Sequence, residues 1–495
     1  MTKKTGEHFD IAIVGGGPSG YAAAMRALDF GKRVVVIEKN HLGGAGAING
    51  ALSSKTWWAL SREAATLRAG LERYGLPVYT PSMAAVRSEV DRAMAERLDL
   101  MQAQMSALMQ GGYGHLLSYR QGQARVLAPG RIELTSAEGL SLIVADNIIL
   151  ATGSRPRHLP GILVDETHIL SSDGIEHLQE FPESLVIVGA GVIGCEYATI
   201  FSGFGRTRVF LIDKGERILP SEDANVVAEV EHNLEANGVH IHRNSRLVSM
   251  RVEDGGVRYE LEFVDGERRS FLVEKALVAI GRVAATEGLW AEDVDIETGA
   301  NGIVASSTAT SVPGIYAVGD LTADIALVNV GELEGRHAVE QICGAQPDPL
   351  IYENISTIMF LHPEVAGVGI NETRAAELGI PYRVATLAYT AIPGAIVTRR
   401  VRGFINLLVT DDEHLRILGM RVVGHQASST IQAVALLISM KKGISELAEC
   451  VHPHPSISEG IQECVRALLG KSILKPQVTG GQIQCRTVRP QVRSP

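Results

Sequence analysis

The stretch IVGGGPSG, residues 13–20, decides the fold of the first part of the chain. An apolar run, Phe9 to Val14, leads into it, an alanine-rich segment typical of a helix follows, and a second apolar run ends in Glu38. This order of strand, glycine turn, helix, strand and acid is typical of a dinucleotide-binding unit, in which the acid accepts a hydrogen bond from a ribose hydroxyl. Three glycines would permit the tight turn, the approach of a pyrophosphate and the packing of helix on strand, in the order Gly15, Gly17 and Gly20.

The same unit recurs in the middle of the chain. An apolar run, residues 185–188, leads into the motif GAGVIG, and a later run, residues 209–212, ends at Asp213. Two such units imply two dinucleotides, the arrangement needed to pass a hydride from one cofactor to another. Asp213 would favour a free ribose 2′-hydroxyl and so predicts NAD(H) over NADP(H), a preference that Lys214 and Arg217 weaken. The glycines of this second turn are Gly189, Gly191 and Gly194.

Composition sets outer bounds on function. The chain has 495 residues, 45% of them hydrophobic, with 52 glycines, which is enough for about three or four domains. A net charge of −10 without a long basic run argues against nucleic acid as the main partner. Residues 1–10 are polar, and no uninterrupted apolar run reaches the roughly 18 residues of a membrane helix. We therefore expect a soluble, cytoplasmic protein without a membrane span.

The cysteines do not indicate a metal site or an obvious redox pair. They lack CxxC or metal-ligand spacing, so we expect buried or incidental thiols. The final segment, residues 471–495, is basic, contains no acid and is expected to be flexible. The five cysteines of the chain are Cys195, Cys343, Cys450, Cys464 and Cys485.

Five further motifs follow one another along the chain. They are ATGSRP at 151–156, AIGR at 279–282, GIYAVGD at 314–320, LHPEVAGVG at 361–369 and HPSISE at 454–459. Together with the two nucleotide units, these motifs resemble the FAD-dependent pyridine nucleotide-disulfide oxidoreductases, and within that family the dihydrolipoamide dehydrogenase branch most closely. The resemblance extends from residue 10 to about residue 469.

The resemblance implies an α/β fold of the glutathione reductase type. It consists of two Rossmann-like dinucleotide-binding domains, one for FAD and one for NAD, and an α+β C-terminal interface domain that forms a homodimer. The expected divisions are an FAD-binding domain at 1–155, an NAD-binding domain at 156–280, a central second part of the FAD-binding domain at 281–350, an interface domain at 351–470 and a basic flexible tail at 471–495.

The resemblance also assigns cofactor-binding residues. FAD would be held by Gly15, Gly17, Gly20 and Glu38, by Thr152 and Gly153 of the ATG motif, by Asp320 at the ribityl chain and by Ala326 near a helix N-terminus at the flavin pyrimidine edge. NAD(H) would be held by Gly189, Gly191, Gly194, Asp213 and Gly281.

Two charged residues imply that the flavin is reduced by a nicotinamide. In the family, Lys55 would lie beside flavin N5 and would be paired with Glu196. A fixed cation there stabilises the negative charge that the flavin gains on reduction, and its buried charge needs a counter-ion. Without such a role, Lys55 would be a solvated surface lysine.

The chain departs from the family at residues 42–55, LGGAGAINGALSSK. The family segment reads approximately GG-x-C-x4-C-x-P-S-K, and aligning its ends places Gly46 and Ala51 at the two cysteine positions and Ser53 at the proline. Neither Gly46 nor Ala51 can carry a thiolate, so the usual dithiol exchange is chemically unavailable. Soluble pyridine nucleotide transhydrogenase, a relative, lacks one of these cysteines and exchanges hydrides between nicotinamides.

His454 and Glu459 match the acid-base pair that the partner subunit supplies in the family. Without a thiol, the pair would either protonate another acceptor, such as a quinone oxygen, or persist as an interface hydrogen bond, and both roles stay open. Cys485 is a candidate for a replacement thiol, because Arg486 and Arg489 would lower its pKa.

The predicted function is that of an FAD-dependent NAD(P)H oxidoreductase. Electrons would pass from NADH through flavin to a non-disulfide acceptor such as a quinone, a second nicotinamide or a protein partner, with space for the acceptor at Gly46 and Ala51. The alternatives are dihydrolipoyl dehydrogenase-type activity through other thiols, a pyridine nucleotide transhydrogenase, and a catalytically silent FAD/NAD-binding subunit or sensor. The retained Lys55 and Glu196 speak against the silent subunit, whereas the loss of both cysteines speaks for it.

Overall fold

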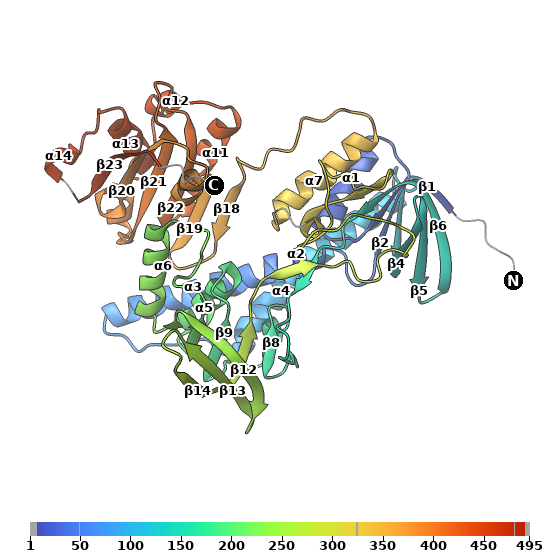
Figure 1. Ribbon diagram of the computed structural model, residues 1–495, viewed down its shortest axis with the longest axis horizontal. Helices are drawn as coiled ribbons and strands as arrows, with labels where there is room; N and C mark the ends of the chain where they lie inside the picture. The colour runs from blue at the N-terminus through green and yellow to red at the C-terminus, as the bar shows by residue number, and fades with distance from the viewer. Residues whose placement is uncertain (1–6, 49, 323–324, 480, 491–495) are drawn as a thin grey trace. The chain divides into compact units, whose positions relative to one another are not determined.

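The computed structural model describes residues 7–48, 50–322, 325–479 and 481–490, which belong to two compact units (Figure 1). Among the helices of these residues, none combines the length and the apolar character that a bilayer crossing requires. The first unit comprises Met1–Leu60, Pro81–Phe181 and Leu277–Leu350, and the second comprises Ser61–Thr80, Pro182–Ala276 and Ile351–Pro495.

A seven-stranded sheet with the order β3-β2-β1-β6-β5-β4, in which β17 also pairs with β6, is the centre of the first unit. Pairs among β1, β2, β3, β6 and β17 are parallel, and those of β4 and β5 are antiparallel. The β-branched run of β2 is buried throughout, as expected for a strand covered on both faces. The strands are β1 (Glu7–Val14), β2 (Val34–Glu38), β3 (Leu117–Gln121), β4 (Gln123–Ala128), β5 (Arg131–Ser136), β6 (Gly139–Leu150) and β17 (Ile315–Ala317).

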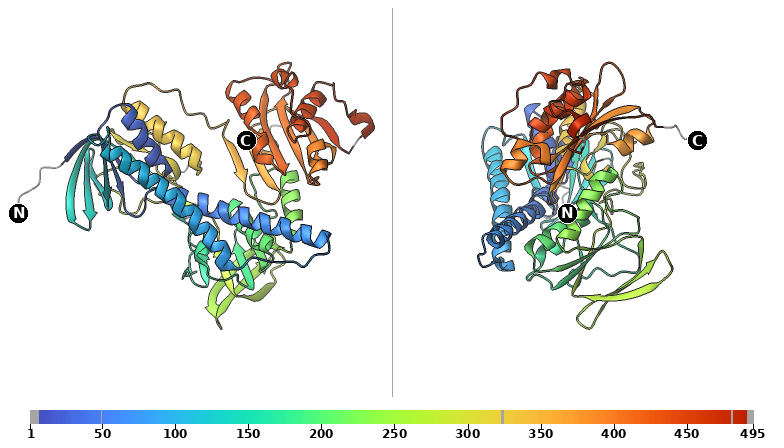
Figure 2. Two further views of the ribbon diagram at one scale, coloured as in Figure 1. Left: turned by 180° about the vertical axis from the view of Figure 1, so that it is seen from behind. Right: turned by 90° about the vertical axis from the view of Figure 1, so that its left-hand side faces the viewer.

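Two helices, α1 (Pro18–Asp29) and α7 (Val328–Ile342), lie side by side in this unit (Figures 1 and 2). Small residues bring them together, because a Cβ on Gly335 would collide with the backbone oxygen of Ser19. The other helices that begin in this unit are α2 (Gly44–Ala47), α3 (Ala51–Arg73) and α4 (Met83–Gln110). Helix α3 begins at Ala51, so that Lys55 lies in its first turns.

The second unit contains the other glycine turn. Parallel strands β9, β10 and β11 form its centre, and β12, β13 and β14 form a separate antiparallel sheet. The elements are β9 (Ser184–Val188), α5 (Val192–Phe204), β10 (Arg208–Ile212), α6 (Ala224–Ala236), β11 (His240–His242), β12 (Ser245–Glu253), β13 (Gly256–Phe263) and β14 (Arg268–Val273).

The C-terminal part of the second unit is a six-stranded sheet with the order β18-β19-β22-β21-β20-β23. Its apolar core includes Leu407, Met420 and Cys464, the last from α13. The elements are β18 (Ser356–Met359), β19 (Glu364–Gly369), β20 (Tyr382–Ala388), β21 (Gly403–Thr410), β22 (Ile417–Gly424), α11 (Gln432–Ser439), α13 (Glu459–Leu468) and β23 (Ile483–Val488). Each of the two units thus contains one Rossmann-like fold, and the second also contains an α+β C-terminal part. This arrangement confirms the predicted fold class.

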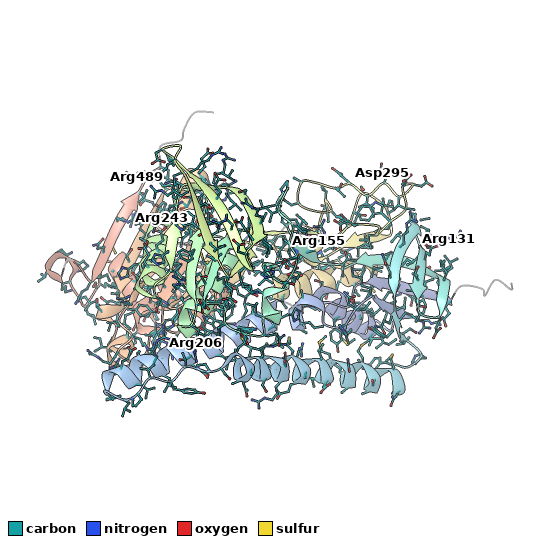
Figure 3. All side chains as sticks on the ribbon, turned by 90° about the horizontal axis from the view of Figure 1, so that it is seen from below. Arg131, Arg155, Arg206, Arg243, Asp295 and Arg489 are labelled. Atoms are coloured by element: carbon teal, nitrogen blue, oxygen red, sulfur yellow. The ribbon has the colours of Figure 1, made fainter. Side chains whose placement is uncertain are left out.

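The prediction that residues 471–495 are flexible is wrong for residues 483–488, because these residues form β23. This strand pairs antiparallel with β20, and Ile483 is buried. Composition suggested flexibility, but the free edge of β20 supplies hydrogen-bond partners and acidic side chains balance the basic ones. Arg489, labelled in Figure 3, lies 3.1 Å from Asp411, and Arg486 forms an ion pair with Glu372. Residues 491–495 of the predicted tail lie outside the described chain.

Shorter elements complete the chain. They are β7 (Ser154–Pro156), β8 (Ile169–Ser171), β15 (Lys275–Val278), β16 (Arg282–Ala284), α8 (Glu372–Glu377), α9 (Pro393–Val397), α10 (Ala427–Thr430), α12 (Ser445–Ala448), α14 (Pro476–Thr479) and 3-10 turns at Ile175–His177, Gly319–Leu321 and Tyr389–Ala391.

Candidate active site

The first glycine turn joins β1 to α1 and has the shape that a pyrophosphate requires. Gly15 has a φ of +111°, and a Cβ there would collide with the carbonyl oxygen of Ala151. A Cβ on Gly20 would collide with the carbonyl oxygen of Gly15, whereas one on Gly17 would meet no described atom within 4 Å. Contacts within the protein therefore require glycine at positions 15 and 20. Gly17 instead borders open space at a helix N-terminus, which is a favourable place for a phosphate.

Glu38 lies at the end of β2, beside this turn. Its side chain is buried, and its Oε2 accepts a hydrogen bond of 2.7 Å from the backbone N–H of Gly16. Its Oε1 accepts one of 2.7 Å from the N–H of Asn40. A carboxylate has about four acceptor sites, so two backbone donors orient Glu38 and leave capacity for ribose hydroxyls.

The second glycine turn repeats this geometry between β9 and α5. Gly189 has a φ of +102°, and a Cβ on Gly194 would collide with its carbonyl oxygen. An added Cβ on Gly191 would again meet no described atom within 4 Å. Asp213 takes the place of Glu38, since its Oδ2 accepts from Ala190 N–H at 2.9 Å and its Oδ1 from Gly215 N–H at 2.7 Å.

Further predicted FAD ligands lie at the carboxyl ends of parallel strands in the first unit. Gly15 follows β1, Thr152 and Gly153 follow β6, and Asp320 follows β17, so the topology places them along one sheet edge. Ligands of open α/β sheets bind at such an edge. The Thr152 hydroxyl donates to Ala285 O at 2.9 Å. Ala326 is exposed just before α7 begins at Val328.

Asp320 is held by a network that the sequence did not indicate. Ser154 Oγ donates to Asp320 Oδ2 at 2.7 Å, and Arg282 Nε donates to the same Ser154 oxygen at 2.9 Å. Helix α7 contributes a buried acid, Glu334, which accepts from Gly319 N–H at 2.6 Å. No motif in the sequence singles out Glu334.

Gly281, predicted to contact NAD(H), belongs to the first unit. Its carbonyl oxygen accepts from Arg157 N–H at 2.9 Å, which ties it to the segment after β7. Its contact with the second cofactor stays a prediction.

Lys55 lies in the first turns of α3 and is half-buried. Its Nζ donates to Ser54 Oγ at 3.3 Å, and Ser54 in turn bonds to the carbonyl oxygen of Gly50. Ser53 and Ser54 are buried, so this part of α3 has a fixed rotation. Lys55 belongs to the first unit and Glu196 to the second, and their pairing stays a prediction.

Glu196 is a buried acid on α5, with a residue exposure of 6%. Its Oε1 accepts a hydrogen bond of 2.9 Å from the backbone N–H of Phe360, just before β19. Burying a carboxylate is costly unless it is paired or hydrogen-bonded. The Phe360 N–H bond supplies part of this compensation.

The segment between Leu42 and Lys55 contains no cysteine. Gly46 lies in α2, and a Cβ there would collide with the Pro18 ring of the first glycine turn. The expectation that Gly46 leaves space for an electron acceptor is therefore wrong, because Pro18 already fills the position of a side chain. Ala51 is half-buried at the start of α3, and Asn49 lies outside the described residues.

His454 and Glu459 form a hydrogen-bonded pair. Their Nδ1 and Oε1 atoms are 2.8 Å apart, and Glu459 Oε2 accepts from Ser456 N–H at 2.8 Å. Burial alone would raise the pKa of Glu459, but the hydrogen bonds from His454 and Ser456 outweigh burial and lower this pKa. With Nδ1 facing the carboxylate, Nε2 of the exposed His454 ring is available to another group.

The cysteines of the structure are all free thiols, and none of the described residues forms a metal-type cluster. Burial raises the pKa of Cys195, Cys343 and Cys464. Cys485 lies on β23, where desolvation by the surrounding protein raises the pKa of its thiol although the residue as a whole is exposed. The expectation of a lowered pKa at Cys485 is therefore wrong.

Cys485→Ser is expected to leave NADH-driven turnover unchanged within about twofold. A thiol with a raised pKa is mostly protonated at neutral pH and is a poor nucleophile. Alkylation of Cys485 should accelerate as pH rises through its pKa, which mass spectrometry of the labelled peptide would follow. A large loss of turnover in this variant would restore Cys485 as a redox group.

Comparisons with known proteins agree with this geometry. Residues 9–338 match the family described as Pyridine nucleotide-disulphide oxidoreductase, and residues 355–465 match its dimerisation domain. Dihydrolipoyl dehydrogenase of Bacillus subtilis is 33% identical over 94% of this chain and 99% of its own length. The mitochondrial dihydrolipoyl dehydrogenase of Schizosaccharomyces pombe is 30% identical over 94% of this chain and 91% of its own.

Two solved structures share the fold. LpdA from Mycobacterium tuberculosis superposes with a TM-score of 0.83 at 28% identity, covering 92% of this chain and 99% of its own. The flavoprotein disulfide reductase RclA from Escherichia coli gives a TM-score of 0.79 at 22% identity over 93% and 100% of the two chains. The predicted glutathione reductase-like architecture is confirmed.

Proposed function

Because the chain belongs to the pyridine nucleotide-disulphide oxidoreductase family, we propose that it is an FAD-dependent NADH oxidoreductase whose electron acceptor is not a disulfide. The family binds FAD and NAD(P)H, and its dimerisation domain supports a homodimer. One observation carries the proposal: both dinucleotide turns are complete, whereas residues 42–55 contain no cysteine.

The residues of the first unit fit FAD. Gly17 borders open space at the N-terminus of α1, Glu38 is held by two backbone N–H groups and keeps acceptor sites for ribose hydroxyls, and Asp320 is held in place by Ser154. In the second unit, Gly191 and Asp213 offer the same features to NADH. When bound, FAD supplies a carrier that takes a hydride from NADH and passes electrons to an acceptor.

Lys55 would hold a positive charge beside the flavin, and Glu196 would be its counter-ion. The Phe360 N–H bond fixes the Glu196 carboxylate, and the buried Ser53 and Ser54 fix the turn that carries Lys55. These contacts support a preorganised charge pair, which needs no rearrangement when negative charge develops on the cofactor.

The acceptor is proposed to be a quinone, a second nicotinamide or a protein partner. Burial raises the pKa of Cys195, Cys343 and Cys464, and the pKa of Cys485 is raised as well. These four thiols are therefore poor nucleophiles for disulfide exchange. His454, oriented by Glu459, would donate a proton to a quinone oxygen, the role for which its exposed Nε2 is suited. The alternative role, an interface hydrogen bond, predicts an unchanged turnover in His454→Ala.

Dihydrolipoyl dehydrogenase-type activity is the second candidate, because the relatives at 33% and 30% identity carry that name. This reading requires thiols other than the usual pair. Cys450 is exposed four residues before His454 and is the available candidate. Lipoamide reduction that is lost in Cys450→Ser would favour this function over the first.

Anaerobic mixing of the FAD-loaded protein with NADH tests the proposal. NADH is expected to bleach the flavin absorbance at least about tenfold faster than NADPH, because Asp213 repels a 2′-phosphate. A quinone added next should restore the absorbance, and lipoamide should not. If a nicotinamide analogue alone restores it, the protein is a transhydrogenase. A flavin that stays oxidised would contradict the catalytic role and favour a silent subunit or sensor.

A further inference from the structure

A cavity of about 910 Å³ lies within the second unit, and its lining includes no residue of either glycine turn. Four parts of the chain contribute to it: α3, the C-terminal end of α6, residues 362–364 at the start of β19, and residues 399–402 before β21. His425, after β22, completes the lining. Pockets of roughly 300–1,000 Å³ are typical of small-molecule sites.

The cavity is positively charged in a chain whose net charge is −10. Four arginines line it against two glutamates, which leaves a formal charge of +2 when the histidines are neutral. Positive charge collected in a concave surface focuses the field and attracts anions. The arginines are Arg62, Arg399, Arg400 and Arg402, and the glutamates are Glu63 and Glu364.

The Glu364 carboxylate, one of the two in the lining, is already occupied by protein groups. Glu364 accepts from Arg62 at 2.8 Å and from Ser428 Oγ at 2.8 Å, and it is buried. It therefore balances Arg62 and cannot also neutralise the segment 399–402.

The three other arginines have no carboxylate partner among the described residues. Arg400 Nη2 donates to Thr66 Oγ1 at 3.2 Å, and Arg402 Nη1 donates to Asn233 Oδ1 at 3.0 Å. Both partners are neutral, and each guanidinium has five N–H donors, most of which remain unused. Arg399 has neither an ion pair nor a side-chain hydrogen bond within the described chain.

Two histidines, His362 and His425, also line the cavity. Burial, followed by the charges of Arg400 and Arg62, lowers the pKa of His362 to about 4 against the opposing effect of Glu364. Burial and Arg400 also lower the pKa of His425. Both rings are therefore neutral at pH 7, and each offers one N–H donor to an anion.

We propose that this cavity binds a phosphate ester of a small organic molecule. Several guanidinium groups that can each form paired hydrogen bonds match the oxygens and the double charge of a phosphate. The volume exceeds that of the phosphate group alone, and Leu67, Pro363 and Val401 offer apolar surface to the organic part. The lining shares no residue with either dinucleotide turn, and occupancy of the cavity can be measured without an electron acceptor.

The test uses phenyl phosphate as the probe, with inorganic phosphate, phenol and citrate as matched comparisons. Isothermal titration calorimetry on the FAD-loaded protein should show phenyl phosphate binding more tightly than either phosphate or phenol. In the double variant Arg399→Gln/Arg402→Gln, the dissociation constant should rise at least about tenfold, because two charge-assisted contacts are lost. Both side chains belong to exposed residues, so the variant is expected to fold.

A matched control removes two charges elsewhere. Arg131 and Arg206, labelled in Figure 3, are exposed, do not line the cavity and have no ion pair within the described chain. Arg131→Gln/Arg206→Gln should leave the dissociation constant within about twofold of the parent. The proposal is overturned if phenyl phosphate does not bind, if the cavity variant binds it as the parent does, if both double variants weaken it equally, or if citrate binds and phenyl phosphate does not.

Discussion

Lys55→Met is expected to slow the NADH-driven bleaching of the flavin about a hundredfold, while FAD remains bound. Removing one preorganised electrostatic contact to a developing charge typically costs a factor of about 100 to 1,000 in rate. Lys55 lies in a turn fixed by two buried serines, so methionine should occupy the same position without its charge. Stopped-flow absorbance under anaerobic conditions would measure the rate at saturating NADH.

Two further variants make this result specific. Lys55→Arg keeps the charge and should recover part of the rate, and Lys39→Met removes an exposed lysine and should leave the rate unchanged. Glu196→Gln should resemble Lys55→Met if the two residues form the proposed pair. A Lys55→Met protein that bleaches as fast as the parent would show that Lys55 is a solvated lysine and would contradict the proposed reduction step.

Gly191→Ala is expected to weaken NADH binding about tenfold to a hundredfold, with FAD content and thermal stability unchanged. The backbone at Gly191 has φ −76° and ψ −172°, which alanine adopts readily, and its added Cβ meets no described atom within 4 Å. The methyl group would instead occupy space intended for the pyrophosphate, and such overpacking costs about 1–3 kcal/mol. Fluorescence titration with NADH would give the dissociation constant.

The neighbouring glycine separates binding from folding. At Gly194 an added Cβ collides with the carbonyl oxygen of Gly189, so Gly194→Ala should lower the melting temperature as well as the affinity. In the first unit, Gly17→Ala should reduce FAD content without altering the response to NADH of the molecules that retain FAD. Equal NADH affinity in Gly191→Ala and the parent would remove this turn from the NADH site.

The glycine turns and their acids could be predicted from sequence because their geometry is local. Gly20 packs against the carbonyl oxygen of Gly15, and Glu38 accepts from the N–H of Gly16, so each spacing in the motif reflects a contact within the turn. The start of α3 at Ala51 was not predictable in this way. It depends on how the preceding segment, with Gly46 against Pro18, packs on the first turn.

Features that depend on distant contacts were missed. Composition suggested that residues 471–495 were flexible, but the edge of β20 provides a pairing partner that composition does not contain. The cavity brings together Arg62, Asn233, His362 and Arg400, which are too far apart in the chain to form a motif. The Lys55 and Glu196 assignments rest on family resemblance, because no local pattern links two residues so distant in sequence.

The strand β23 also bears on how the molecule avoids aggregation through a sheet edge. Without β23, the β20 edge would present unpaired backbone groups beside buried Val384 and Leu387, a template for intermolecular strand addition. With β23 in place, the outermost strand instead carries Arg486 and exposed polar neighbours, which act as gatekeepers against aggregation. A short basic segment near the chain end thus protects a large apolar sheet from polymerisation.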